Sequence, residues 1–320
     1  MRKLKALTVS VLATGLITGC GLGTAGGYVR SGELAGPVAD VNLEGASIAV
    51  GSKDFTEQAI LGKMMVILAQ SAGADTQDLT NVPGSQSVRQ AMLQGIMDFQ
   101  WEYTGTAWIT YLGNVDPIVD DQEQFDAVQD ADAEFGLHWV QPSAVNNTYA
   151  MMMTRERSEE LGVTAMSDLA ELDESDLTYC IAAEFASRND GFEPMLEHYD
   201  IPPASPDQRR MMDQGATFQA TANGECAFGQ TTATDGRIPA LDLVVLEDDL
   251  AYFPKYNLSG VIGEELYELY PQVEDLVIPL TERLDNETMA ELNARVDVDG
   301  EEPGDVAWDF LVQEGYLIDE

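Results

Sequence analysis

The chain has 320 residues, of which 45% are hydrophobic, and its formal net charge at pH 7 is −40. This length is enough for two domains that each bury a core of their own. A surface this acidic repels nucleic acid and anionic lipid, which excludes both as partners. Because the acidic residues are spread along the whole chain, we interpret the charge as an adaptation to high salt; a basic substrate is the alternative explanation.

The N-terminus predicts an export signal. Basic residues at positions 2, 3 and 5 precede an apolar run over residues 6–17, which is too short to span a membrane. Ile17-Thr18-Gly19-Cys20 follows this run and resembles a bacterial lipobox, whose cysteine carries the lipid and becomes the mature N-terminus. We therefore expect a signal peptide over residues 1–19 and lipidation of Cys20. An ordinary secretory signal with a chance cysteine is the alternative.

The residues after the signal predict a lipid-anchored protein. Glycine, alanine and serine are frequent between residues 21 and 40, so we expect a flexible tether over residues 20–45. No later stretch of the sequence is long and apolar enough to span a bilayer. We therefore expect the mature protein to lie outside the cytoplasm, held at the cell membrane by its lipid.

Strands and helices alternate in the first part of the folded chain. Residues 46–53 predict a strand, and the following helix is expected to have Thr56 as its N-cap and Phe55 packed on Ile60. Further strands are expected over residues 80–83, 97–101 and 138–140, and further helices over residues 86–94 and 125–135. This order predicts an α/β fold with a mostly parallel sheet.

Polar and aromatic residues follow one of these strands directly. The segment Glu102-Tyr103-Thr104-Gly105-Thr106 comes at the carboxyl end of the strand over residues 97–101. Ligands of open α/β sheets bind at that end of the strands, so the segment is a candidate ligand site. A core aromatic followed by a turn glycine is the alternative.

The alternation starts again at residue 149. Strands are expected over residues 149–153, 178–184, 226–230 and 243–246, and residues 209–212 are expected to form a strand or to enter a helix. Helices are expected over residues 166–172, 191–198 and 215–223. After a last strand over residues 259–262, the chain is expected to close with helices over residues 266–270, 273–280, 287–296 and 304–314.

The two series of elements predict two lobes, the second inserted into the first. We expect lobe 1 to comprise residues 46–148 plus 254–320, and lobe 2 to comprise residues 149–253. Crossover segments near residues 145–149 and 252–257 would join them. A cleft between two lobes joined in this way can close around a ligand by hinge motion.

Cys180 and Cys226 are the other two cysteines, and each precedes an apolar run. An even pair in an oxidising compartment predicts a disulfide, with two buried free thiols as the alternative. His138 and His198 are isolated, without a Cys/His cluster, so we expect no metal site.

Four groups of residues resemble the glycine betaine/carnitine/choline-binding proteins of osmoprotectant ABC importers. They are Gly51–Gln58, Glu102–Ala107, Thr234–Ile238, and Leu246–Asp249 together with Phe253–Asn257. They occur in the order of that family, and the resemblance extends over residues 46–315. It implies a two-lobe periplasmic-binding-protein-like fold (type II) and delivery of a small compatible solute to the subunits of an ABC permease. We expect a monomer without a cofactor.

The resemblance implies an aromatic cage. A quaternary ammonium has no N–H to donate, so aromatic faces hold it through cation–π attraction. Tyr103, Tyr149 and Tyr256 stand at the positions of cage tyrosines in the family. Thr232 stands where the family often has a further aromatic residue, usually tyrosine, so that one wall is missing.

The missing wall leaves the identity of the ligand open. Phe228, Trp101 or Gln230 could compensate for Thr232, and without compensation the ligand could be a larger one or a solute that is not quaternary, such as ectoine.

The resemblance also implies donors for the carboxylate of a betaine. Arg188 stands at the position of the arginine that pairs with this carboxylate, and Glu184 could orient its guanidinium. Lys53 and Thr106 stand at positions of further donors, and Asn147 at a position that contributes its backbone carbonyl.

The residues do not predict an enzyme. We find no Ser/His/Asp arrangement, no Gly-x-Ser-x-Gly segment and no phosphate-binding loop. A solute-binding protein without catalysis of its own is therefore the prediction. An extracytoplasmic enzyme or a sensor built on the same scaffold is the alternative.

Overall fold

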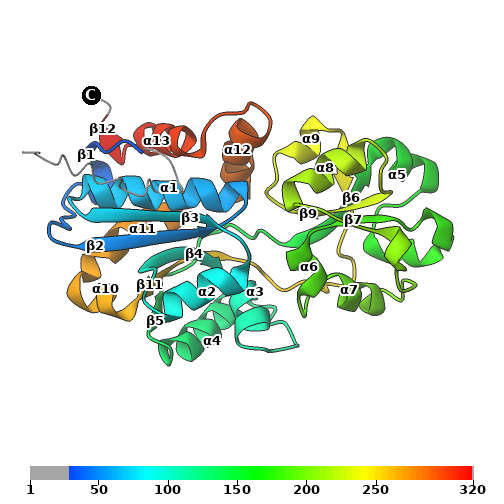
Figure 1. The fold of residues 1–320 in the computed structure, drawn as a ribbon, viewed down its shortest axis with the longest axis horizontal. Helices are drawn as coiled ribbons and strands as arrows, with labels where there is room; N and C mark the ends of the chain where they lie inside the picture. Colours follow the sequence, from blue (N-terminus) through cyan, green and yellow to red (C-terminus); the bar gives the residue numbers. More distant parts are fainter. Residues whose placement is uncertain (1–28, 319–320) are drawn as a thin grey trace, which may run out of the picture.

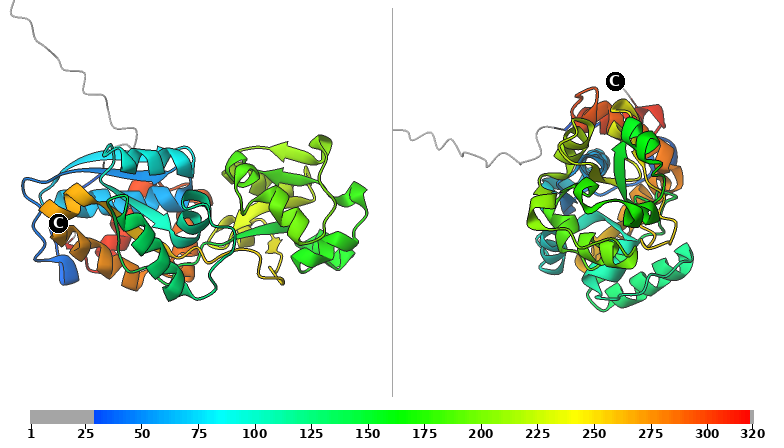
Figure 2. Two further views of the ribbon diagram at one scale, coloured as in Figure 1. Left: turned by 90° about the horizontal axis from the view of Figure 1, so that it is seen from below. Right: turned by 90° about the vertical axis from the view of Figure 1, so that its right-hand side faces the viewer.

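The computed structural model describes residues 29–318, which form two lobes side by side along the longest axis of the molecule (Figures 1 and 2). The expected signal peptide over residues 1–19, Cys20 and the first part of the expected tether lie outside the described residues. Within residues 29–318, no helix combines the length and the apolar character that crossing a membrane requires.

Lobe 1 is built on a five-stranded sheet with the strand order β3-β2-β4-β11-β5. Its strands are β2 (Ser47–Lys53), β3 (Asp75–Val82), β4 (Phe99–Tyr103), β5 (Leu137–Trp139) and β11 (Leu258–Gly263). Its helices are α1 (Thr56–Ser71), α2 (Ser85–Leu93), α3 (Thr104–Thr106), α4 (Asp121–Ala133), α10 (Glu264–Leu269), α11 (Glu274–Arg283), α12 (Asn286–Asp297) and α13 (Pro303–Gln313).

The core of lobe 1 lies on both faces of this sheet. On one face, α1 lies between strands β2 and β3 and helices α12 and α13, with α11 beside it against β11, and its residues from Ile60 to Ala69 are all buried. A helix that is apolar on nearly every side is stable only when it is enclosed in this way. On the other face, α2 and α4 bury a separate cluster that includes Val88, Phe125 and Trp139.

Lobe 2 is built on a second five-stranded sheet with the strand order β10-β6-β9-β7-β8. Its strands are β6 (Tyr149–Thr154), β7 (Tyr179–Ile181), β8 (Arg209–Met211), β9 (Phe228–Thr232) and β10 (Leu243–Val245). Its helices are α5 (Arg155–Leu161), α6 (Ala183–Ser187), α7 (Phe192–His198), α8 (Gln214–Ala222) and α9 (Arg237–Ala240).

In each sheet, the strand that directly follows a crossover is antiparallel to the other strands. Strands β2, β3 and β4 pair in parallel, whereas β11 pairs antiparallel with both β4 and β5. Likewise β7 is parallel to β8 and β9, whereas β6 pairs antiparallel with β9 and β10. The predicted two-lobe α/β fold is therefore confirmed. In each sheet, four of the five strands run in the same direction and one runs in the opposite direction.

The two crossovers run side by side between the lobes. Asn146 and Asn257 form an antiparallel bridge. The backbone N–H of Asn147 donates to the carbonyl of Tyr256 at 3.1 Å, and the backbone N–H of Tyr256 donates to Oδ1 of Asn146 at 2.8 Å. These bonds hold the first crossover, which leads into lobe 2, against the second crossover, which leads back to lobe 1.

The predicted flexible tether over residues 20–45 is wrong for its second half. Strand β1 (Glu33–Leu34) pairs with β12 (Leu317–Ile318) near the C-terminus, and Val38 and Leu43 are fully buried. The frequency of small residues suggested a linker, but the apolar side chains of this segment find a surface on lobe 1 that composition does not reveal. Residues 33–45 therefore belong to the folded body.

Smaller departures concern the ends, the number and the types of elements. The N-cap of α1 is Phe55 and not Thr56, whose hydroxyl donates to Oδ1 of Asp297 at 2.6 Å. The strand expected over residues 178–184 ends at Ile181, and α6 begins two residues later. Helix α5 was not predicted, and the helix expected over residues 166–172 is a 3-10 helix over Met166–Glu171.

Cys180 on β7 and Cys226 just before β9 are joined by a disulfide with a Cα–Cα distance of 5.7 Å. It connects the starts of two neighbouring parallel strands that are 46 residues apart in sequence, and it adds a covalent link to their hydrogen-bonded pairing.

The double variant Cys180→Ala/Cys226→Ala should lower the free energy of unfolding. Loop-closure entropy for a 46-residue separation corresponds to about 4 kcal/mol at most. Denaturant titration of the wild type and the double variant measures the difference in the free energy of unfolding. The reduced wild type, which lacks the bridge but keeps both cysteine side chains, separates the effect of the bridge from that of the lost side chains. A change below about 1 kcal/mol would argue that the bridge contributes little to the stability of lobe 2.

Candidate ligand-binding site

A small cavity of about 60 Å³ lies where the lobes and the crossovers meet. It is lined by Lys53, Asp54, Phe55, Gly84, Ser85, Tyr103, Thr106, Asn147, Tyr149, Glu184, Gln214, Thr232 and Tyr256. A wider cleft of about 830 Å³ shares Asp54, Phe55, Gly84, Glu184 and Gln214 with it. Both lobes thus contribute to one enclosed space with an opening beside it.

The structure brings the ligand residues expected from the sequence together. Seven of them line the cavity: Lys53, Tyr103, Thr106, Asn147, Tyr149, Thr232 and Tyr256. Arg188 does not line it but lies directly behind two of its tyrosines, with its guanidinium carbon 5.2 Å from the ring centre of Tyr149 and 5.7 Å from that of Tyr256.

Four aromatic side chains form part of the cavity wall. The rings of Phe55 and Tyr103 are nearly parallel with centres 6.4 Å apart, and the rings of Tyr149 and Tyr256 are perpendicular with centres 5.5 Å apart. Tyr103 is the last residue of β4, and Phe55 lies between β2 and α1. Tyr149 is the first residue of β6, and Tyr256 lies on the return crossover. Lobe 1, lobe 2 and the return crossover therefore all supply rings.

Phe55 supplies a ring that the sequence analysis did not assign to the ligand site. It was expected only to pack on Ile60 as part of the helix start. Its extended backbone before α1 (φ −130°, ψ 159°) leaves its ring against Tyr103 at the cavity. Its place just after β2, separated from Lys53 only by Asp54, was the signal that could have identified it.

The residues considered as substitutes at the Thr232 wall lie elsewhere. Trp101, Phe228 and Gln230 are fully buried, and none of them lines the cavity. Thr232 itself lines the cavity and is paired with Tyr149 across β9 and β6.

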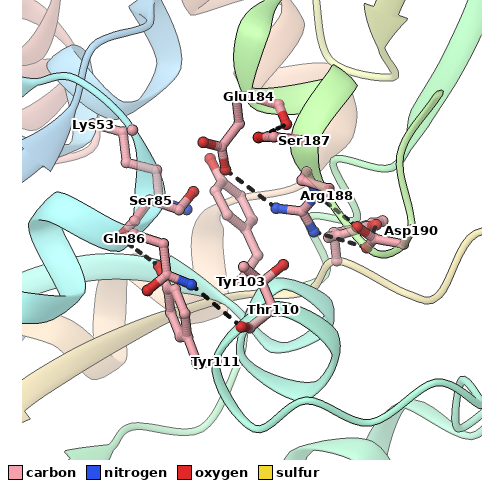
Figure 3. Close-up of polar contacts among 12 residues, drawn as sticks. Lys53, Ser85, Gln86, Tyr103, Thr110, Tyr111, Glu184, Ser187, Arg188 and Asp190 are labelled. Atoms are coloured by element: carbon pink, nitrogen blue, oxygen red, sulfur yellow. Dashed lines mark hydrogen bonds and ion pairs between the residues drawn. The ribbon is translucent and has the colours of Figure 1, made fainter. Parts of the chain in front are cut away.

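The guanidinium of Arg188 is held by carboxylates of its own lobe (Figure 3). Its Nε and Nη2 donate to the two oxygens of Asp190 at 2.6 and 2.7 Å, and Nη1 contacts Oε1 of Glu184 at 3.5 Å. The hydroxyl of Tyr256 also donates to Asp190. Burial raises the pKa of Tyr256 well above its ordinary value, and Asp190 adds to this while Arg188 opposes it, so the hydroxyl keeps its proton.

Lys53 forms a buried ion pair with a carboxylate of lobe 1. Its Nζ donates to Oε1 of the buried Glu102 at 2.5 Å and lies 4.8 Å from the ring centre of Tyr103. Glu102 also accepts from the hydroxyl of Tyr111 at 2.5 Å. The Lys53–Glu102 pair therefore leaves little net positive charge on this wall.

A buried carboxylate, Glu57, joins lobe 1, the first crossover and lobe 2. It accepts from the hydroxyl of Tyr103 at 2.6 Å, the amide of Asn147 at 2.9 Å, the hydroxyl of Thr234 at 2.5 Å and the amide of Asn293 at 3.3 Å. Burial raises the pKa of Glu57 above its ordinary value, and the four hydrogen bonds oppose this rise. The wall residue Tyr103 is thereby connected to lobe 2 through one carboxylate.

Lobe 2 touches α12 of lobe 1 closely beside this carboxylate. A Cβ added at Gly236 would lie 2.6 Å from the backbone of Ala294, so only glycine allows the approach. Arg237 next to it pairs with Asp235 and lies 3.4 Å from Asp297 of α12. Among residues 29–318, no group of histidine, cysteine and acidic side chains is arranged to hold a metal ion.

Comparisons with known proteins agree with this arrangement. A family model described as the substrate-binding domain of the ABC-type glycine betaine transport system matches residues 46–313. The glycine-betaine-binding protein of Pseudomonas aeruginosa is 38% identical over 282 residues, which cover 86% of this chain and 89% of that protein.

Two further proteins are similar over most of this chain. The ergothioneine transport permease/ergothioneine binding protein EgtU of Helicobacter pylori is 29% identical over 275 residues, 85% of this chain and 48% of that protein. A crystal structure titled as a glycine betaine/carnitine/choline ABC transporter is 26% identical, covers 84% of this chain and 97% of that one, and has a TM-score of 0.67.

The raised pKa of Glu57 predicts a pH effect on stability. The folded protein retains this proton at pH values where the unfolded chain has released it, so the contribution is full below the ordinary pKa of 4.5 and is lost as pH rises through the raised value. The stability of wild type relative to Glu57→Gln should therefore fall with rising pH in that window.

Denaturant unfolding of both proteins at a series of pH values measures this difference. Glu159→Gln removes the same charge from an exposed position and is the matched control. A difference between wild type and Glu57→Gln that stays flat, or that grows with pH, would contradict the raised pKa.

Proposed function

The chain belongs to the family of substrate-binding domains of ABC-type glycine betaine transport systems, and on this premise we propose that it captures a quaternary ammonium solute between its lobes. In this proposal, the lipid on Cys20 keeps the protein at the outer side of the cell membrane, and the closed form delivers the solute to an ABC permease. Glycine betaine, choline and carnitine are the first candidates, and the relative EgtU adds ergothioneine.

The observation that carries the proposal is the set of four aromatic rings around one interlobe cavity. Phe55, Tyr103, Tyr149 and Tyr256 all line it. An ammonium that has no N–H cannot be recognised by hydrogen-bond acceptors, whereas each aromatic face attracts it by roughly 0.5–2 kcal/mol. The same faces bury its methyl groups, which adds a hydrophobic contribution.

Phe55 also bears on the alternative ligand. Thr232 left a solute that is not quaternary, such as ectoine, open as the alternative, because one wall of the cage was missing. With Phe55 as the fourth ring, the cavity has an aromatic lining without an aromatic residue at position 232. We therefore place the quaternary ammonium solute first and ectoine second.

For a ligand that carries a carboxylate, we propose Lys53, Thr106 and Arg188 as donors. Thr106 lines the cavity from α3, directly after β4, and Lys53 lines the same cavity. Both cations already have carboxylate partners in the protein, so a betaine must share or replace one of these pairs. Closure of the lobes then depends on contacts such as Glu57 to Thr234, which form only when the lobes meet.

A panel of solutes tests the proposal. Thermal unfolding and isothermal titration calorimetry at high salt would compare glycine betaine, choline, carnitine, proline betaine, ergothioneine and ectoine. A ligand that binds only the folded state raises the unfolding temperature by mass action. Binding of at least one quaternary ammonium solute is expected; binding of ectoine alone, or of none, would contradict the proposal.

Tyr149→Leu should weaken binding of the quaternary ammonium solute roughly tenfold, because it removes one ring face from the cavity. Tyr149→Phe keeps the ring and should lose much less. Calorimetric affinities of the two variants separate the face of the ring from its hydroxyl. Equal losses in both variants would mean that Tyr149 acts through its hydroxyl and not as a cage wall.

A further inference from the structure

We propose that Glu184 competes with the carboxylate of the ligand for Arg188 and thereby sets the preference between zwitterionic betaines and cationic solutes such as choline. This inference rests on the proposed function and assigns a selective role to a residue outside the aromatic wall.

Glu184 stands at the entrance of the site and reaches across it. It lies in the first turn of α6 in lobe 2 and lines both the cavity and the wider cleft. Its carboxylate points toward Arg188 (Figure 3). Its Oε2 would lie 3.7 Å from a Cβ placed on Gly84, the residue before α2 in lobe 1. A solute that enters between the lobes passes this carboxylate.

The contact of Glu184 with Arg188 is the exchangeable one. Asp190 holds two guanidinium nitrogens at 2.6 and 2.7 Å, and its side chain is only 5% exposed. Glu184 holds the third nitrogen at 3.5 Å, and its side chain is 31% exposed. Short, buried, bidentate pairs are strong, whereas long, solvated ones are weak. A competing carboxylate therefore displaces Glu184 and leaves Asp190 in place.

The other cation at the cavity offers no easier position. Lys53 is bonded to Glu102 at 2.5 Å, and the side chains of both are 5% exposed or less. A carboxylate that takes over Nζ of Lys53 separates a buried ion pair, which is costly, and one that shares Nζ lies against the carboxylate of Glu102, whose charge repels it. Nη1 of Arg188 lies behind Tyr149 and Tyr256 on a side chain that is only 2% exposed, so a ligand carboxylate reaches it by taking the place of Glu184.

Ligands of different charge meet Glu184 differently. A betaine must displace the carboxylate of Glu184 from Nη1 of Arg188 and then hold its own carboxylate there. The two carboxylates are both negative, so they repel each other at this short distance. Choline has no carboxylate, leaves the Glu184–Arg188 contact intact, and is attracted by the negative charges of Glu184 and Asp54 on the wall. Glu184 therefore disfavours betaines and favours cationic solutes.

Glu184→Gln tests this role because it removes the charge and keeps the shape. Calorimetric dissociation constants for glycine betaine and choline are measured on wild type and variant in the same buffer. Glycine betaine should bind more tightly and choline less tightly, so that the ratio of the two constants shifts by about tenfold or more toward betaine.

Two further variants separate pairing from charge. Glu184→Asp keeps the charge but shortens the side chain, so it should tighten glycine betaine while choline stays within about twofold of wild type. Asp54→Asn removes a charge from the same wall without touching Arg188, and it should shift the ratio less than Glu184→Gln does. Thermal unfolding of each unliganded variant verifies that it is folded.

The outcomes distinguish this inference from the proposed function. If both solutes bind but Glu184→Gln leaves the ratio unchanged, or weakens both equally, the role of Glu184 is wrong and the proposed function stands. If Asp54→Asn shifts the ratio as much as Glu184→Gln, a general charge effect replaces the competition. If neither glycine betaine nor choline binds wild type or variants, the inference fails, whereas the proposed function fails only if no other quaternary ammonium solute of the panel binds.

Discussion

The buried carboxylate of Glu57 is the interaction on which the closed arrangement of the lobes depends. Its four hydrogen-bond donors come from β4, the first crossover, lobe 2 and α12. A charged group buried without such partners would be strongly unfavourable, so Glu57 holds these four segments in one geometry. Because Tyr103 is one of the donors, the position of a ring in the cavity wall is coupled to the contact between the lobes. The absence of a side chain at Gly236 allows lobe 2 to come this close.

Around this connection, the site separates two kinds of recognition. In the proposed function, aromatic faces from lobe 1, from β6 and from the return crossover attract an ammonium through the polarity of their rings and the exclusion of water, which requires no free charge on the protein. The cations beside the cavity are neutralised within the protein by Glu102 and Asp190. In our proposal, discrimination by charge then depends on Glu184, whose contact with Arg188 is longer than that of Asp190.

The fold could be predicted from the sequence largely because its elements follow local rules. Apolar runs, helical spacing and the restart of the α/β pattern near Tyr149 reveal two lobes and two crossovers. The tether could not be predicted correctly because the pairing of β1 with β12 joins opposite ends of the chain. The roles of Phe55 and Glu57 in the site were missed for related reasons. The ring of Phe55 belongs to a wall that forms only when distant segments meet. The chain has 56 acidic residues, and no local pattern in the sequence distinguishes the buried Glu57 from the others.

A crystal structure of the protein with a bound quaternary ammonium solute tests the central claim most directly. We expect the ammonium to lie among Phe55, Tyr103, Tyr149 and Tyr256, between closed lobes, with Glu57 still bonded to Thr234 across them. A solute bound elsewhere on the molecule, or bound in the cleft with its ammonium away from these rings, would contradict the account.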